Sequence, residues 1–528
     1  MRLVIKEYLA KLKEKNELDL LLCDLLLQLG YITDNKPETG NRQYGVDIQA
    51  HKKNEMLLCV VKQGNIDRRI WNDDQSAIRQ SIEEIKDVYL RQMTSKEKRK
   101  KIHIVVATNG VLSEAVRPNW EGFVEYNKCW DGISIEIELW NIDTIVDYIH
   151  ETLLNEYLFT DNMQSLLRKA LYFIGESDYN NIYFEQIIDI YISRFGKGQN
   201  KKNYQKEVAS LYLATQMIAQ YAADCKLFKL AIMVSEYLLI RYWKFLLQNN
   251  LFEKKIYIEW LLTFCKSYEK WNDYYWNAVS KCCREKDAFP QYNLVEQKVM
   301  LYEVVGYMAS YAYYLFEYNK KKSLNIIEDI ISLINNNQQF YYAPYDGNIT
   351  VISILYRLLA KHEQMENINI LLEEQSIKLL NYYRVNHKYP VSTDSFKDAI
   401  DLELRNSIED YEASGMWGMF ILWLVLLDKE ELYNQLKEFL DKDLQKVTKC
   451  LWFLPASEEE LFYDKYAMNL AGDGIAVDAE IDFRTLVKKM KFILNQYERE
   501  NFSFNMYSFS AIEIINCRYY NYIPSVPL

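Results

Sequence analysis

The stretch GVDIQA at residues 45–50, followed after a short break by LLCVVK at residues 57–62, decides the fold of the first part of this chain. Both runs are apolar and have the length of a strand. Adjacent strands would bring the two charged residues, Asp47 and Lys62, side by side at the edge of a sheet. Side chains alternate along a strand, so Lys62 shares its face with Val60.

Helix and strand signals around this stretch alternate along the chain. The apolar run at residues 102–108 predicts a buried strand that stops at an Asn-Gly pair, and Gly30 predicts the end of a helix. The expected order is helix 17–29, the two strands above, helix 73–93, strand 102–108, a helix from residue 113, strand 133–139 and a helix from residue 142. This order predicts an α/β domain over residues 1–155, with a mixed sheet flanked by helices.

The chain changes character after the predicted α/β domain. From residue 158 to the end, helical periodicity dominates and alternating strand patterns are almost absent. We therefore expect a large all-α domain over residues 156–528, a helical array of solenoid-like or irregular form, with a subdivision near residues 340–350. The apolar run at residues 416–427 is too short to span a bilayer and predicts a buried helix.

Composition and charge limit the function classes. The chain has 528 residues, so two or more domains are expected, and its net charge of −11 argues against attraction to nucleic acid over the whole surface. Nine cysteines are scattered without a Cys-x-x-Cys pair, which is typical of reduced thiols. The first residues, MRLVIKE, lack the apolar core of a signal peptide. We expect a cytoplasmic protein.

The predicted pair of Asp47 and Lys62 points to phosphodiester chemistry. A divalent cation such as Mg²⁺ or Mn²⁺ activates water and neutralises charge in phosphoryl transfer, and it prefers carboxylate oxygens. A nearby ammonium group can stabilise the developing negative charge. The sequence contains no Gly-x-x-x-x-Gly-Lys-Ser/Thr loop, no Gly-x-Gly-x-x-Gly loop, no His-x-x-x-His and no Gly-x-Ser-x-Gly elbow.

Several motifs together resemble the PD-(D/E)xK restriction-endonuclease-like superfamily, in particular its Mrr-type branch. They are Asp19 in a helix that ends Leu-Gly-Tyr, the run Gly45-Val46-Asp47-Ile48, the run Val60-Val61-Lys62, and the apolar strand that ends Ala-Thr-Asn-Gly at residue 110. The resemblance covers residues 10–150. It implies a metal-dependent DNA endonuclease of a restriction or anti-phage (antiviral) defence system. Asp47 would bind the metal, Asp19 would contact it through water, and Lys62 would assist catalysis.

Val60 departs from the family pattern, which has Glu or Gln at this position to bind metal or position water. One interpretation is that the ligand has moved, with Gln49, Gln80 and Glu83 as candidates. The other is that the site no longer cleaves, and that the domain is a nuclease-like scaffold that binds DNA or protein. The sequence leaves both open.

A local basic excess indicates where nucleic acid would bind. Arg68, Arg69, Lys98, Arg99 and Lys100 are the candidate phosphate contacts, although such a basic run is also typical of a solvated loop. The expected partner of the first domain is DNA. For the helical domain we expect a phage or host protein that acts as a trigger, a partner subunit, or a second copy of the chain.

Overall fold

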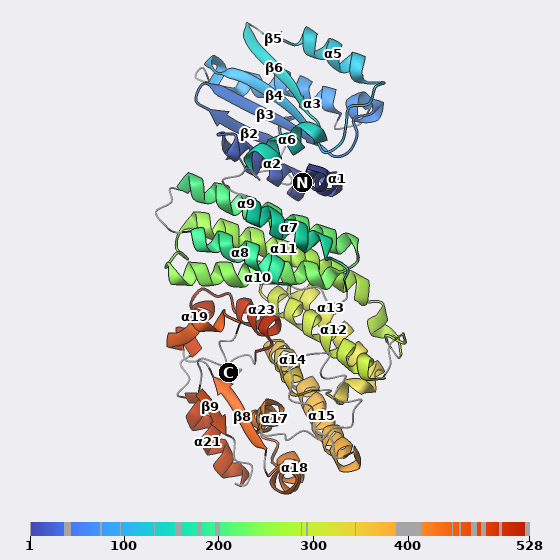
Figure 1. The fold of residues 1–528 in the computed structure, drawn as a ribbon, viewed down its shortest axis with the longest axis vertical. Helices are drawn as coiled ribbons and strands as arrows, with labels where there is room; N and C mark the ends of the chain where they lie inside the picture. Colours follow the sequence, from blue (N-terminus) through green and yellow to red (C-terminus); the bar gives the residue numbers. More distant parts are fainter. Residues whose placement is uncertain are drawn as a thin grey trace. The chain divides into compact units, whose positions relative to one another are not determined.

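The chain forms two compact units. The computed structural model describes residues 2–35, 44–73, 77–94, 97–130, 132–153, 160–176, 181–195, 201–286, 288–291, 294–343, 345–386, 413–445, 447–453, 456–465, 473–476, 482–495 and 499–522 (Figure 1). Unit 1 spans residues 1–227 and unit 2 spans residues 228–528. Among the helices described, none is both long enough and apolar enough to cross a membrane.

A mixed sheet of six strands forms the centre of unit 1. Its strand order is β1-β2-β3-β4-β6-β5. The strands are β1 (Ile32–Asn35), β2 (Ile48–Lys52), β3 (Glu55–Lys62), β4 (Lys101–Thr108), β5 (Cys129–Trp130) and β6 (Ile133–Trp140). The β1-β2-β3 pairs are antiparallel, β3-β4 and β4-β6 are parallel, and β5 runs antiparallel to β6. The prediction of an α/β part with a mixed sheet is confirmed.

Helices cover both faces of this sheet (Figure 1). They are α1 (Arg2–Lys11), α2 (Asp19–Gln28), α3 (Ile78–Glu84), α4 (Leu90–Gln92), α5 (Arg117–Tyr126) and α6 (Ile142–Thr152). Side chains of β3, β4 and β6 pack with α3 and α5 in one hydrophobic cluster. Helices α2 and α6 pack against strands of the same sheet. Because both faces are covered, every residue of β3 after Glu55 is buried.

Gly30 and Gly45 both have a positive φ, which the turns at these positions require. Gly30 has φ +93° and follows the end of α2, as predicted. Gly45 has φ +82°, and a Cβ on it would lie 2.2 Å from the carbonyl oxygen of Ser81. The chain therefore enters β2 in direct contact with the backbone of α3, which only glycine permits.

Unit 1 continues past the α/β elements because a long helix is attached to them. After α7 (Asp161–Tyr172) and α8 (Ile182–Arg194), α9 (Lys201–Asp224) packs against α1 and α2. Gln28 Nε2 donates to the Lys206 carbonyl at 3.1 Å, and Ser210 Oγ donates to the Leu153 carbonyl at 2.5 Å. The predicted boundary at residue 155 marks the end of the α/β elements, whereas the compact unit ends at residue 227.

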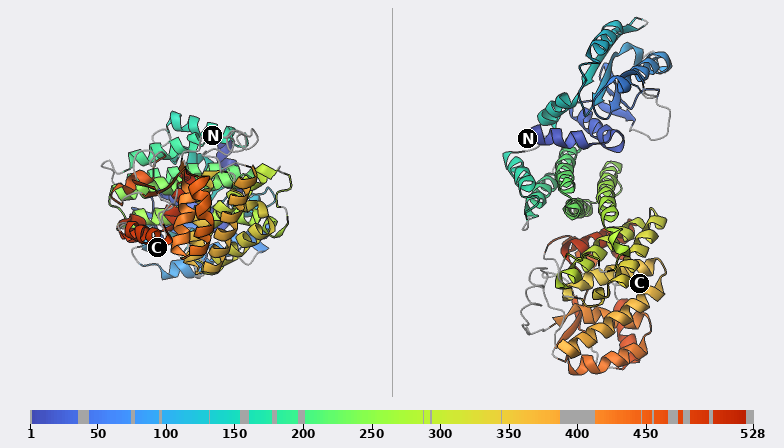
Figure 2. Two further views of the ribbon diagram at one scale, coloured as in Figure 1. Left: turned by 90° about the horizontal axis from the view of Figure 1, so that it is seen from below. Right: turned by 90° about the vertical axis from the view of Figure 1, so that its right-hand side faces the viewer.

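Unit 2 is mainly helical. Its helices are α10 (Phe228–Gln248), α11 (Lys255–Val279), α12 (Leu294–Leu315), α13 (Lys320–Asn336), α14 (Ile349–Lys361), α15 (Met365–Asn386), α17 (Gly415–Leu426), α18 (Glu430–Lys442), α19 (Glu459–Phe462), α21 (Phe483–Asn495), α22 (Ser503–Met506) and α23 (Ala511–Tyr520). Helix α14 packs against α15, and the yellow to orange helices of this unit run close together in Figure 2. Helix α12 packs against both α13 and α14, which flank residues 340–350. The predicted buried helix at residues 416–427 is confirmed as α17.

A small sheet in unit 2 differs from the all-α expectation. Its order is β7-β8-β9, with β7 (Ala413–Ser414), β8 (Thr448–Phe453) and β9 (Asp473–Ala476). Two of these strands have four residues or fewer, which is too short for an alternating pattern to be recognised. For that reason the sequence did not predict this sheet.

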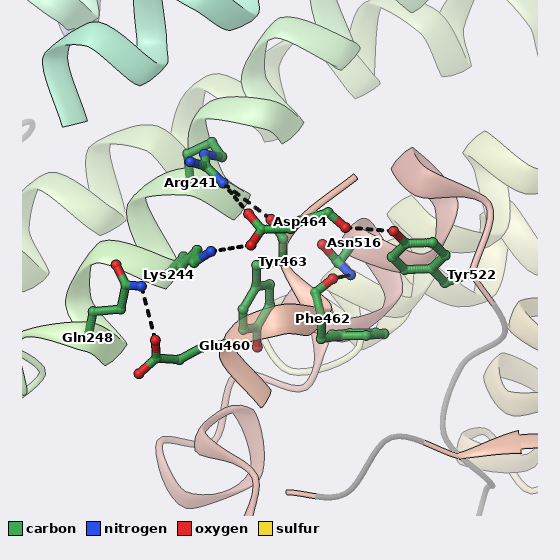
Figure 3. A network of polar contacts seen from close by, with 9 residues as sticks. All are labelled: Arg241, Lys244, Gln248, Glu460, Phe462, Tyr463, Asp464, Asn516 and Tyr522. Atoms are coloured by element: carbon green, nitrogen blue, oxygen red, sulfur yellow. Dashed lines mark hydrogen bonds and ion pairs between the residues drawn. The ribbon is translucent and has the colours of Figure 1, made fainter. Parts of the chain in front are cut away.

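Polar contacts join distant segments of unit 2. Asp464 accepts from Arg241 Nη1 at 2.8 Å and lies 2.5 Å from Lys244 Nζ, so the segment around α19 is attached to α10 (Figure 3). Arg357 of α14 and Glu513 of α23 form two hydrogen bonds of 2.8 Å and are 3% and 0% exposed. Such buried pairs fix the relative position of helices that are far apart in sequence.

Candidate functional site

The structure places Asp47 and Lys62 at the same end of two paired strands. Asp47 precedes β2, and its amide donates to the Cys59 carbonyl at 2.9 Å. Its carboxylate Oδ2 accepts from the Val61 amide at 2.7 Å, so it reaches the residue next to Lys62. The antiparallel register of β2 and β3 produces this juxtaposition, because Ile48 pairs with Cys59.

Lys62 is a buried cation. It is the last residue of β3, pairs with Thr108 of β4 and is 9% exposed. Among the residues described, none forms a hydrogen bond or an ion pair with its side chain. The stem of this side chain is therefore buried, and its ammonium group can form hydrogen bonds with an anion that approaches the end of β3.

The electrostatics of Asp47 show which charges surround the site. Burial raises its pKa, whereas the hydrogen bond from Val61 and the charge of Lys62 lower it. The charge of Glu14 raises the pKa further, and that of Lys15 lowers it. The net shift of the pKa is upward because loss of solvation is the largest effect.

Glu14 is a residue that sequence reasoning missed. It lies in the π-helical segment Glu14–Leu18, whose backbone turns at Asn16 with φ +65°. The only sequence signal for this turn is the asparagine itself, because asparagine adopts a positive φ more readily than most residues. No sequence motif pointed to Glu14. The segment brings a second carboxylate toward Asp47. Within the described part of the chain, no group of three or more His, Cys, Asp or Glu side chains could hold a metal ion.

Asp19 accepts backbone hydrogen bonds at the start of α2. It is the first residue of α2 and is 6% exposed. Its Oδ1 accepts from the Leu20 amide at 2.7 Å, and a backbone hydrogen bond at Asn16 also lowers its pKa. Burial outweighs these hydrogen bonds, so the pKa of Asp19 is raised. The charges that act most strongly on Asp47 come instead from Lys62, Glu14 and Lys15.

Val60 is part of the hydrophobic core. It is 0% exposed and belongs to the cluster that includes Leu58, Ile78, Ile82 and Val106. An apolar side chain in that position has no oxygen to offer a metal ion or a water molecule. Valine at position 60, where the PD-(D/E)xK pattern has Glu or Gln, therefore serves to pack β3 against the core.

The three candidate replacement ligands are not gathered at the site. Gln49 is half-buried in β2 and pairs with Leu58. Gln80 and Glu83 are exposed on α3, and Glu83 lies 3.0 Å from Arg79 in an ion pair. In the described part of the chain, no hydrogen bond joins Gln49, Gln80 or Glu83 to Asp47 or Lys62.

The backbone after Lys62 is locked to the backbone after β4. Thr108 Oγ1 donates to the Gly64 carbonyl at 2.6 Å, and the Gly64 amide donates to Asn109 Oδ1 at 2.7 Å. Gly64 has φ +80°. A Cβ on Gly110 would lie 2.3 Å from the Gly64 carbonyl carbon, so the two loops touch through their backbones. This arrangement fixes the point at which Lys62 leaves the sheet.

The candidate phosphate contacts fall at opposite ends of the parallel strands. Exposed Arg68 and Arg69 follow β3 at the end that carries Lys62. Residues 98–100 precede β4, whose first residue pairs with Glu55 at the start of β3. Seven residues of strand separate the two ends, which is roughly 23 Å. The structure therefore does not bring Lys98, Arg99 and Lys100 together with Lys62.

A second polar cluster lies within the same sheet. His103 of β4 is 8% exposed, with Nδ1 3.2 Å from Glu55 Oε1 and Nε2 3.0 Å from Glu138 Oε2. The Tyr31 hydroxyl donates to Glu55 at 2.8 Å. Burial lowers the pKa of His103, but the hydrogen bond to Glu138 and the surrounding carboxylates outweigh burial and raise it. The charge of Glu136 contributes to this rise.

Comparisons of the chain with protein-family models, with curated proteins and with solved structures gave no match.

Proposed function

We propose that unit 1 is a metal-dependent DNA endonuclease of a restriction or anti-phage defence system, with its site at Asp47 and Lys62. The observation that carries the proposal is the position of Asp47 and Lys62 at the same end of β2 and β3, where the charge of Lys62 lowers the pKa of Asp47 and, among the described residues, no hydrogen bond engages the Lys62 ammonium. The elements that the resemblance implies, α2, β2, β3, α3 and β4, occur in that order. A phosphodiester would supply an anion with which the Lys62 ammonium can form hydrogen bonds.

The carboxylates present fit a magnesium or manganese ion that takes most of its ligands from water and substrate. Mg²⁺ in phosphoryl-transfer sites is held by one or two protein carboxylates, with water and phosphate oxygens completing its shell. Asp47 would hold it, and Glu14, whose charge raises the pKa of Asp47, is the candidate for a second carboxylate. When bound, such an ion activates water and neutralises phosphate charge.

The side chains of the chain itself would bind and orient the substrate. Lys62 would donate hydrogen bonds to a non-bridging phosphate oxygen, whose negative charge grows during the reaction. Arg68 and Arg69 at the same end of the sheet would contact neighbouring phosphates. In this proposal the protein acts in the cytoplasm, and the helices of unit 2 recognise a trigger or a partner, either a phage or host protein or a second copy.

The burial of Val60 in the core favours a second function. Its place in the core leaves the site with fewer ligands than the family pattern, and the described residues hold no group of three metal-binding side chains. Under this alternative, unit 1 is a nuclease-like scaffold that binds DNA without cleaving it.

Plasmid cleavage in Mg²⁺ or Mn²⁺ tests the first function. Asp47→Asn keeps an oxygen that can accept from Val61 while it removes the charge, so loss of activity would not reflect loss of the backbone contact. We expect Asp47→Asn and Lys62→Met to slow cleavage by about 100-fold or more. Asp87→Asn, an exposed carboxylate of the same unit, is the matched control.

The outcomes separate the two functions. Equal cleavage by the wild type and both site variants contradicts the proposed site. Absence of cleavage, together with duplex DNA binding that Lys62→Met weakens, supports the scaffold. Absence of both cleavage and DNA binding in the wild type contradicts both functions.

A further inference from the structure

A buried asparagine joins the two chain segments that carry the charges of the candidate site. Asn109 follows β4 and is 4% exposed. Its Nδ2 donates to the carbonyl oxygens of Leu9 and Leu12, both at 2.8 Å. Its Oδ1 accepts from the Gly64 amide at 2.7 Å. Both donor hydrogens and the acceptor of this amide are therefore used.

The two segments lead directly to the charged residues. Gly64 lies two residues after Lys62, and Leu12 lies two residues before Glu14. The carbonyl groups of Leu9 and Leu12 stand at the carboxyl end of α1, and the Leu9 carbonyl also accepts from the Leu12 amide at 3.1 Å. Because a buried peptide group without a partner is costly, the bond from Asn109 to the Leu12 carbonyl favours one position of the α1 end relative to the loop after β3.

We infer that Asn109 is a positioning residue of the candidate site: it holds the Lys62 loop in a fixed position relative to the segment that carries Glu14. The inference rests on the proposed function for the reaction that the site performs. The connection between the loop after β3 and the end of α1 rests only on the three hydrogen bonds of Asn109. Thr108 holds the same loop, because its hydroxyl donates to the Gly64 carbonyl at 2.6 Å.

A matched pair of variants separates positioning from general stability. Asn109→Leu removes the three hydrogen bonds. Asn127 is an equally buried asparagine of the same unit, 5% exposed, which donates to the Phe123 carbonyl at 2.8 Å and accepts from Trp130 Nε1 at 2.9 Å. It adjoins β5, which pairs with the start of β6, at the end of the parallel strands away from Lys62. Asn127→Leu should therefore lower the melting temperature without reaching the site.

Binding and cleavage provide the first readout. In the full chain, Asn109→Leu should weaken binding of a fluorescein-labelled DNA duplex by about fivefold, which is the effect of losing one or two hydrogen bonds. It should slow plasmid cleavage in Mn²⁺ by about 100-fold, because misplaced groups lose most of their effect. Equal losses in Asn127→Leu would show a stability effect and would overturn the positioning role.

A signal from Gly64 provides a second readout that needs no activity. Gly64 is the one glycine in the sequence that follows a glutamine, Gln63. Labelling glutamine with ¹³C at the carbonyl and glycine with ¹⁵N therefore isolates its amide resonance. Leu12→Ala should shift this resonance when Asn109 is present and leave it unchanged in the Asn109→Leu background.

The two readouts fail in different ways. If Leu12→Ala has the same effect on the Gly64 resonance in both backgrounds, the positioning role is overturned, whatever the activity. If the wild type neither binds nor cleaves DNA, the proposed function fails, and the Gly64 resonance alone decides the role of Asn109.

Discussion

Replacement of Val60 by glutamate supplies the carboxylate that the family pattern has at this position, and the structure predicts that it damages the fold instead of creating a ligand. Val60 is 0% exposed among the side chains of the core. The change forfeits about 1.5–3 kcal/mol of apolar burial. Burial of a polar carboxyl group without a partner adds roughly 1–3 kcal/mol. The free energy of unfolding of unit 1 should therefore fall by about 2.5–6 kcal/mol, a large part of the ~5–15 kcal/mol typical of a domain.

Hydrogen exchange of the β3 and β4 amides during a urea titration measures this loss in unit 1 separately from unit 2. Val111→Glu is the matched control, because Val111 is 41% exposed in the same unit. Its substitution should change the free energy of unfolding by only about 0.5 kcal/mol. The reasoning is refuted if Val60→Glu costs less than about 1 kcal/mol and also gains Mg²⁺-dependent plasmid cleavage, because the side chain at position 60 would then reach the metal ion instead of the core.

Two further predictions concern ionised side chains. The free energy of unfolding of unit 1 should be raised below the ordinary histidine pKa of 6.5 and should fall as the pH rises through the raised pKa of His103, because the imidazolium between Glu55 and Glu138 loses its charge. Thermal melts between pH 6 and pH 9 check this: His103→Gln should flatten the pH dependence, and an unchanged slope would count against it. In unit 2, Glu513→Leu should cost about 3–5 kcal/mol because it leaves the Arg357 cation buried without its partner, while Arg357→Met combined with Glu513→Leu should recover most of the loss. Urea unfolding of the four proteins measures the coupling, and simple additivity of the two losses would disprove it.

Long elements with strong periodicity could be predicted from the sequence. The run at residues 102–108 became β4 (Lys101–Thr108), since a buried parallel strand is apolar along its whole length. The helix that ends at Gly30 and the buried helix α17 were also expected. Within the predicted helix 73–93, α3, a π-helical turn (Ile85–Tyr89) and α4 follow one another with helical backbone at both junctions. The apolar spacing of residues 78–89 continues through the π-helical turn, so the sequence pattern did not reveal the change of helix type.

The candidate site was only partly predictable. The juxtaposition of Asp47 and Lys62 followed from two adjacent strands, because their register depends on local pattern. The approach of Glu14 depends on a turn at Asn16 and on the packing of α1 and α2, which no local pattern encodes. Equally, the backbone hydrogen bonds that engage Asp19 could not be distinguished by sequence from the contacts of a metal ligand.

The strand order of unit 1 has a consequence for self-association. β3 and β4 have a strand on both sides, whereas the two-residue β5 pairs only with Ile133 and Ser134 of β6. Among the described strands, residues 135–140 of β6 therefore pair with β4 on one side and with no strand on the other. Such an open strand edge presents peptide groups to another chain, so this edge, and not the four-residue β1, is where a partner or a second copy would add a strand.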